Sequence, residues 1–159
     1  MPTITLKTII SAPLEVCFDL SRSIDLHTIS TQHTGEQAVA GVTSGLIGLG
    51  ETVTWRARHF GVWQHLTSRI TEFDRPIYFM DEMVKGAFKQ FRHEHHFEQK
   101  TDSTTMTDIF AYTSPLGMFG KAADRLFLKA YMKRLMLERN RVIKEYAENG
   151  KYREVLAIT

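Results

Sequence analysis

The chain has 159 residues, of which 43% are hydrophobic, and its 20 Lys and Arg against 18 Asp and Glu leave a net charge of only +2. This composition is ordinary for a soluble protein, and the length fits one domain, residues 1–159, around a single core. A membrane-spanning protein is excluded, since no stretch approaches the about 18 consecutive apolar residues of a transmembrane helix. The only cysteine, Cys17, excludes an internal disulfide, and the first residues lack the pattern of a signal peptide, so we expect a cytoplasmic protein.

The first part of the chain predicts one strand followed by two short helices. Residues 3–10 alternate between apolar and polar side chains, which is typical of a strand with one buried face. Pro13 suits the first position of a helix, and Glu15 then lies in its first turn. A second short helix is predicted over Ser23–Ile29.

The middle of the chain predicts six further strands, which follow one another in a meander. Their predicted bounds are Gly35–Val42, Glu51–Phe60, Val62–Phe73, Ile77–Lys85, Phe88–Lys100 and Thr105–Thr113. Two of these strands are separated by Gly61 alone, which predicts a tight hairpin.

A glycine-rich stretch, residues 45–50, superficially resembles a phosphate-binding loop. No Lys-Ser/Thr pair follows it, as a Walker loop requires, and Val53 stands where a dinucleotide fingerprint needs glycine. We therefore interpret the stretch as a structural turn.

The last part of the chain predicts one long helix, from Phe119 to Asn149. It contains no proline, its apolar residues recur at helical spacing, and Asn149-Gly150 forms a stop signal. A helix of about eight turns is roughly 45 Å long and needs a wide surface to lie on. The simplest arrangement is an α+β fold in which this helix rests on one large, curved antiparallel sheet.

A basic stripe follows this helix, because Lys121, Arg125, Lys129 and Lys133 are spaced by four residues. Aromatic residues are not interleaved with it and no nucleic-acid-binding motif accompanies it. We interpret the stripe as a solvated face, and we expect neither nucleic-acid binding nor stable membrane insertion.

The last two strands carry the most informative pattern. A symmetric turn centred on Asp102-Ser103 would pair His95 with Phe110 and His93 with Tyr112. The face turned toward the long helix then carries Phe91, His93, His95, Phe97, Met106, Asp108, Phe110 and Tyr112.

Buried polar groups on this face need partners, because an unpaired one costs about 1–3 kcal/mol. Two explanations stay open. Asp108 could accept a hydrogen bond from a histidine or from Tyr112, or the face could line a cavity in which water or a ligand satisfies these groups.

Two other strands add side chains to the same side. Trp55 and His59 share one face of their strand. For residues 77–85 a two-residue turn at Gly86-Ala87 would turn Tyr78, Met80 and Glu82 inward, whereas a three-residue turn would turn Phe79, Asp81 and Met83 inward. We favour the second.

The run His93-Glu94-His95-His96 raises the question of a metal site, which His59 could join. No second compact group of Cys, His, Asp or Glu lies elsewhere, so we expect no metal and no cofactor. Cys17 lies on an apolar helix face, which favours a structural thiol over a nucleophile.

The sequence resembles the START-like, or SRPBCC, superfamily, whose helix-grip fold is that of the birch-pollen allergen Bet v 1 and of polyketide cyclases. The resemblance covers nearly the whole chain and is carried by the order of elements, by residues 79–97 with their Phe, Asp, Gly and His spacing, and by residues 108–117. Within this superfamily the sequence is most similar to bacterial members that are loosely described as cell-division inhibitors. It implies a seven-stranded sheet that grips the long helix around a hydrophobic cavity, with two short helices after the first strand.

This resemblance implies a protein that binds or transports a hydrophobic small molecule, such as a lipid or a polyketide. Two alternatives remain: a cyclase- or dehydratase-like enzyme that uses cavity His, Asp and Tyr groups as acid and base, and an interaction module with a filled core. We favour the non-catalytic role, with a weak homodimer as a possible assembly. The predicted ligand-binding residues are Trp55, His59, Phe79, Asp81, Phe91, His93, His95, Phe97, Met106, Asp108, Phe110, Tyr112, Phe119 and Phe127.

Overall fold

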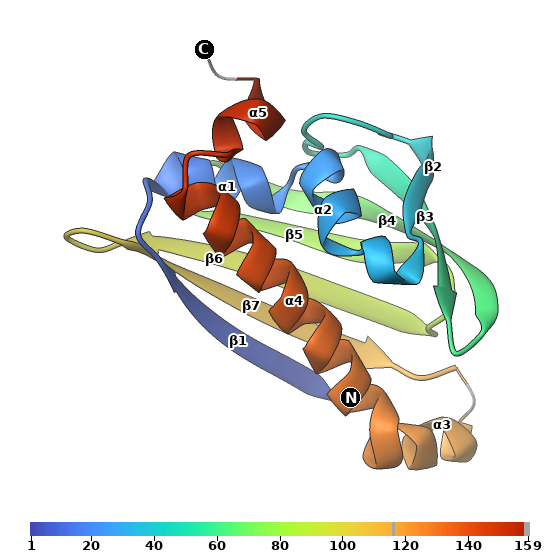
Figure 1. Ribbon diagram of the computed structural model, residues 1–159. Coiled ribbons are helices and arrows are strands. Elements are labelled where there is room, and N and C mark those ends of the chain that lie inside the picture. The colour runs from blue at the N-terminus through green and yellow to red at the C-terminus, as the bar shows by residue number, and fades with distance from the viewer. Residues whose placement is uncertain (116, 158–159) are drawn as a thin grey trace.

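The computed structural model describes residues 1–115 and 117–157, apart from the side chains of residues 120, 124 and 125. A long helix crosses one face of a seven-stranded sheet (Figure 1). In chain order the elements are β1 (Thr3–Ile10), α1 (Leu14–Ser21), α2 (Ile24–Ser30), the 3-10 helix η1 (Gln32–Thr34), β2 (Gln37–Gly41), β3 (Thr52–His59), β4 (Val62–Asp74), β5 (Tyr78–Lys85), β6 (Gln90–Gln99), β7 (Thr104–Thr113), α3 (Gly117–Ala123), the π-helical turn η2 (Asp124–Leu128), α4 (Lys129–Glu148) and α5 (Tyr152–Leu156).

The sheet is antiparallel throughout, with the strand order β1-β7-β6-β5-β4-β3-β2. The meander from β2 to β7 places β1 beside the last strand, so β1 and β2 form the two edges. A connection between opposite edges has to cross the sheet, and α1 and α2 make this crossing on the face that also carries α4 (Figure 1). The predicted α+β architecture is confirmed.

The short helices begin where the local chemistry predicts. Pro13 precedes α1 in an extended conformation. Ser23 caps α2, since its side-chain oxygen accepts a hydrogen bond from the backbone N–H of Leu26 at 3.1 Å.

The predicted long helix is confirmed in extent, but it is not uniform. It runs from Gly117 to Glu148 and contains the π-helical turn η2. The wider turn shifts the faces of the helix, because residues before and after it no longer keep a 3.6-residue spacing. A further short helix, α5, follows the predicted stop at Asn149-Gly150.

The predicted apolar stripe is wrong in the first half of this helix. Phe119 is 83% exposed and Leu126 is 77% exposed. Phe119 belongs to α3, which lies beyond the ends of the strands (Figure 1), and Leu126 belongs to the π-helical turn that follows it. Among the described residues of the helix, Leu128, Met132 and Met136 pack against the cluster around Phe110, and Val142, Ile143 and Ala147 pack in the main core.

The basic stripe is solvated as far as it is described. Lys121, Lys129 and Lys133 are exposed, and the side chain of Arg125 lies outside the described residues. Within the described part of the chain, no helix is both long and apolar enough to cross a bilayer.

The β6–β7 hairpin has the predicted faces but a different register. His95 lies opposite Asp108 and His93 opposite Phe110, so the predicted pairing with Tyr112 is wrong. The turn is centred one residue earlier than predicted, since Gln99 pairs with Thr104. The side-chain amide of Gln99 stabilises this turn by donating to the carbonyls of Lys100 at 2.8 Å and Ser103 at 3.0 Å.

This shift moves the pairing by two residues, and an even shift leaves every side chain on its predicted face. Its consequence is that His95 faces Asp108 directly. The preferred orientation of β5 is also confirmed, since Phe79 is buried and lines the cavity together with Asp81.

An ion pair ties α1 to the corner between β4 and β5. Arg75 Nη2 donates to Asp19 Oδ2 at 2.7 Å, and Arg22 Nε donates to Asp19 Oδ1 at 2.8 Å. Burial alone would raise the pKa of Asp19, but the hydrogen bonds from Arg75 and Arg22 outweigh it and lower that pKa below its usual range.

Replacing this carboxylate should destabilise the fold. We expect Asp19→Asn to lower the free energy of unfolding at pH 7 by about 1–3 kcal/mol, measured by urea denaturation, because two guanidinium groups lose a charged acceptor. Since the folded pKa is the lower one, this contribution is present above about pH 4 and is lost as the pH falls through the folded pKa. Glu138→Gln, in an exposed pair with Arg141, is the control and should change little. Equal stability of Asp19→Asn and wild type at pH 7 would contradict a stabilising role for this ion pair.

The buried thiol of Cys17 should be inert. Its side chain is fully buried, and burial raises its pKa to about 11, so almost no thiolate exists at pH 8. We expect no reaction with Ellman's reagent in the native state and one equivalent in guanidinium chloride. Rapid stoichiometric reaction of the native protein would show that Cys17 is accessible.

Candidate functional site

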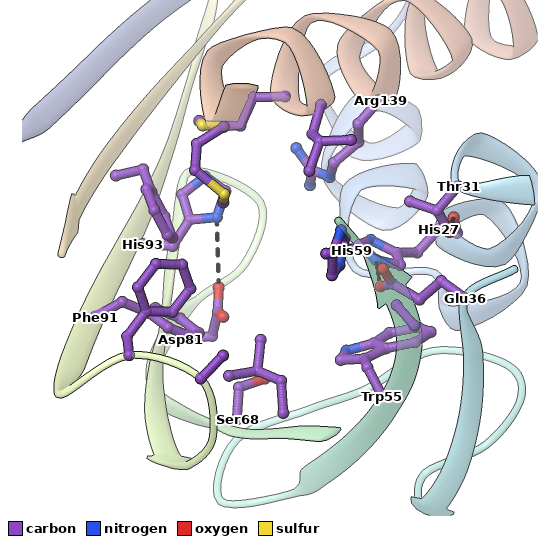
Figure 2. A pocket seen from close by; sticks show the side chains of 18 of the residues that line it. His27, Thr31, Glu36, Trp55, His59, Ser68, Asp81, Phe91, His93 and Arg139 are labelled. Carbon is purple, nitrogen blue, oxygen red and sulfur yellow. Dashed lines mark hydrogen bonds and ion pairs between the residues drawn. The ribbon is translucent and has the colours of Figure 1, made fainter. Parts of the chain in front are cut away.

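A cavity of about 440 Å³ lies between the sheet and the helical segment formed by η2 and α4 (Figure 2). This volume falls within the range of about 300–1,000 Å³ of small-molecule sites. The predicted ligand-binding residues that line it are Trp55, His59, Phe79, Asp81, Phe91, His93, His95, Phe110 and Phe127.

The remaining predicted residues do not line the cavity. Phe97 and Met106 belong to the core, where Phe97 packs edge-on against Phe18 with ring centroids 5.3 Å apart. Their strand ends lie under α1, which fills the space above them. Phe119 is excluded because α3 projects beyond the sheet.

Asp108 and Tyr112 lie behind the cavity wall. Tyr112 is fully buried among aromatic rings, with its centroid 5.6 Å from that of Phe110 and 5.3 Å from that of Phe88. Asp108 is also fully buried and does not line the cavity, but it contacts His93 and His95, which do.

Four residues on three adjacent strands form what we call the carboxylate–histidine cluster: Asp81 on β5, His93 and His95 on β6, and Asp108 on β7. Each histidine lies between the two carboxylates. His93 Nε2 is 3.1 Å from Asp108 Oδ1, and His93 Nδ1 is 3.9 Å from Asp81 Oδ1. His95 Nδ1 is 3.0 Å from Asp108 Oδ1, and His95 Nε2 is 3.1 Å from Asp81 Oδ1.

Aromatic stacking fixes the two imidazole rings. Phe79 lies parallel to His95, with centroids 4.1 Å apart and an interplanar angle of 15°. The ring of His93 also lies against His95, with ring centroids 3.9 Å apart and an interplanar angle of 37°. The rings therefore have little freedom to rotate, and their nitrogens stay directed at the carboxylates.

The helix α4 anchors Asp108 from above. Asn140 Nδ2 donates to Asp108 Oδ2 at 2.7 Å, and Arg139 Nη1 lies 3.4 Å from Asp108 Oδ1. Arg139 Nη2 also donates to the carbonyl of Ser21 at 3.0 Å, which connects α1 to the same network. Sequence reasoning missed Arg139 and Asn140, although their spacing from Met136 and Ile143 places two polar residues on the buried stripe of the helix.

The charge states of the cluster follow from this arrangement. Burial opposes ionisation of Asp108, but the hydrogen bond from His93, the nearby His95 and the charge of Arg139 hold its pKa well below the usual range. The pKa of Asp81 is likewise lowered, since the hydrogen bond from His95 and the neighbouring His93 outweigh burial. Burial, reinforced by the charge of His95, lowers the pKa of His93 to about 4 despite the opposing effect of Asp108, so His93 is neutral at pH 7.

Figure 2 shows His27, Glu36 and His59 on the wall opposite Asp81 and His93. Together with Tyr131, which contacts His59, we call these residues the His27 cluster. His27 Nε2 is 2.5 Å from Glu36 Oε1, and His59 Nδ1 is 2.7 Å from the hydroxyl of Tyr131. Burial would raise the pKa of Glu36, but His27 outweighs it and lowers that pKa. Burial lowers the pKa of His59.

Of this second cluster the sequence predicted only His59. Trp55, also predicted, packs against His27 with ring centroids 4.2 Å apart and the rings tilted by 38°. Nothing in the pattern around His27 and Glu36 distinguishes them from surface residues, because they come from α2 and the loop before β2 and meet only in the folded chain.

No protein-family model matches the chain, and no curated protein sequence matches it. Solved structures do. TTHA0849 from Thermus thermophilus superposes with a TM-score of 0.75 at 16% identity, over 92% of this chain and 97% of that one. Ginseng major latex-like protein 151 from Panax ginseng gives 0.68 at 18% identity, and Ara h 8.0201 gives 0.65 at 12%, each over the same shares of the two chains. At these identities the likeness concerns the fold alone, and it confirms the helix-grip fold that the sequence resemblance implied.

Proposed function

We propose that the chain binds or carries an apolar small molecule, of lipid or polyketide type, in the cavity between the sheet and α4. The observation that carries this proposal is the cavity itself, about 440 Å³ in volume and lined mainly by aromatic and aliphatic side chains. Its two polar clusters face one another across the open space (Figure 2). They would orient polar groups at the ends of a ligand whose middle is apolar.

The fold supports the same proposal. The START-like proteins that the sequence resembles bind lipids, sterols, plant hormones or polyketides in the corresponding space. The fold alone does not distinguish these activities, so the cavity and the side chains that line it carry the proposal of ligand binding. The alternative of an interaction module with a filled core fits poorly, because a volume of about 440 Å³ is far larger than a few buried waters need.

An acid–base enzyme is the second candidate, and one observation favours it. Asp108 orients His93 at 3.1 Å, which is the arrangement of a general base held by a carboxylate. The low pKa of His93, about 4, makes it a weak base at neutral pH, however, since an efficient base has a pKa near the working pH. We therefore rank binding above catalysis.

Ligand binding can be followed through Trp55, which lines the cavity, after Trp63→Phe removes the half-exposed second tryptophan. We expect a saturable change in Trp55 fluorescence with a member of a panel of fatty acids, sterols and aromatic polyketides. Ala57→Leu, which adds bulk inside the cavity, should weaken this binding by about tenfold or more, or ~1.4 kcal/mol.

Ala111→Leu is the matched control, because it makes the same change on the outward face of β7 and should leave affinity unaltered. Either a flat response across the whole panel or equal affinity of Ala57→Leu and wild type would contradict the proposal.

A further inference from the structure

Three donor atoms converge at the cavity wall. Asp81, His93 and His95 each offer one ligand atom, and these atoms all lie within 4.8 Å of one another. Asp81 Oδ1 is 3.1 Å from His95 Nε2 and 3.9 Å from His93 Nδ1. Two ligand atoms of a tetrahedral ion with bonds of about 2.0–2.1 Å are ~3.3 Å apart. The two separations from Asp81, 3.1 Å and 3.9 Å, lie on either side of this distance.

The cluster also contains a conflict that a cation resolves. His95 lies between two carboxylates, but a neutral imidazole has only one N–H to donate. Its Nδ1 has no aligned hydrogen-bond partner among the described residues, although Asp108 Oδ1 is 3.0 Å away. A metal ion bound at His95 Nε2 would leave the Nδ1–H for Asp108, and it would accept lone pairs from both imidazoles and from Asp81 together.

One outer contact, the hydrogen bond between His93 Nε2 and Asp108 Oδ1 at 3.1 Å, already has the form that metal sites use. Metal-bound histidines commonly donate their other ring N–H to a carboxylate, which fixes the tautomer. His93 Nε2 and His95 Nδ1 both lie beside Asp108 Oδ1, which leaves His93 Nδ1 and His95 Nε2 directed at Asp81. Asp108 is itself held by Asn140 at 2.7 Å.

The charge balance favours a cation as well. Two carboxylates, Asp81 and Asp108, face one guanidinium, that of Arg139. A divalent cation would add positive charge beside these two carboxylates in a mostly buried environment, where an unbalanced charge is costly.

We propose that Asp81, His93 and His95 bind one divalent transition-metal ion of the zinc class, with Asp108 as the outer carboxylate and an open coordination position toward the cavity. Two imidazoles and one carboxylate suit zinc and its first-row neighbours, whereas magnesium and calcium prefer sites made of oxygen ligands. The site stands independently of the apolar ligand proposed above. An ion in it would polarise a carbonyl or bind an anionic group at that end of the cavity.

This inference departs from the expectation of no metal. The sequence contains no second compact group of ligands, because the third ligand comes singly from the neighbouring strand, where Asp81 pairs in register with His93.

The first test is a metal titration of the untagged wild-type protein, freed of metal by chelation. We expect isothermal titration calorimetry to show one Zn²⁺ per chain, and bound Co²⁺ to show the absorption bands of a low-symmetry site with nitrogen and oxygen ligands. Mg²⁺ should not compete. Failure of the wild-type protein to bind Zn²⁺ at micromolar concentration overturns the proposal, irrespective of any variant.

Variants then locate the ion. Asp81→Asn and His93→Gln should each weaken Zn²⁺ binding by more than about 100-fold, and Asp108→Asn by about 10- to 100-fold as an outer-shell change. His96→Gln is the matched control, because this histidine is on the same strand but on the outer face, beside Glu94. Circular dichroism and thermal melting of each variant establish that it is folded.

A second control addresses the other histidines in the cavity. Glu36→Gln removes the carboxylate of the His27 cluster and should leave Zn²⁺ affinity unchanged. Loss of binding in Glu36→Gln with retention in Asp81→Asn would assign the ion to the His27 cluster and overturn the proposal. Ala57→Leu, designed to obstruct the apolar ligand, should still bind Zn²⁺, so the two proposals fail separately.

Discussion

The carboxylate of Asp108 connects the sheet to the long helix. It is fully buried, and it accepts from Asn140 on α4 and contacts His93 and His95 of β6. A buried charge without partners would be strongly destabilising, so this carboxylate constrains where α4 can lie on the sheet and how the two imidazole rings are directed. The orientation of His93 and His95 in the cavity wall depends on this one residue, although the residue itself does not line the cavity.

The cavity exists because the helix packs unevenly along its length. Val142 and Ile143 bring the second half of α4 against the core, whereas the helix begins beyond the ends of the strands (Figure 1). The π-helical turn η2 separates the two regimes, and Phe127 within it lines the cavity while Leu126 is exposed. The space that remains between the helix and the curved sheet is the cavity.

Much of the fold was predictable because its signals are local. Strand bounds were predicted within two residues, and the inner faces of β6 and β7 were correct, since alternation has a period of two and does not depend on register. The register itself was wrong because side-chain hydrogen bonds from Gln99 select the turn. The burial of Phe119 was wrong because helical periodicity states which residues share a face and not whether the sheet extends beneath them.

The sequence by itself therefore determined the helix-grip architecture and most of the aromatic lining, because hydrophobic periodicity encodes which side of each element is buried. Only the tertiary structure decided which polar groups meet. Asp81 joins His93 through the pairing of β5 with β6, and Glu36 joins His27 through the docking of α2 beside the loop before β2. Such contacts depend on strand register and helix position, which are set by interactions between residues far apart in the chain.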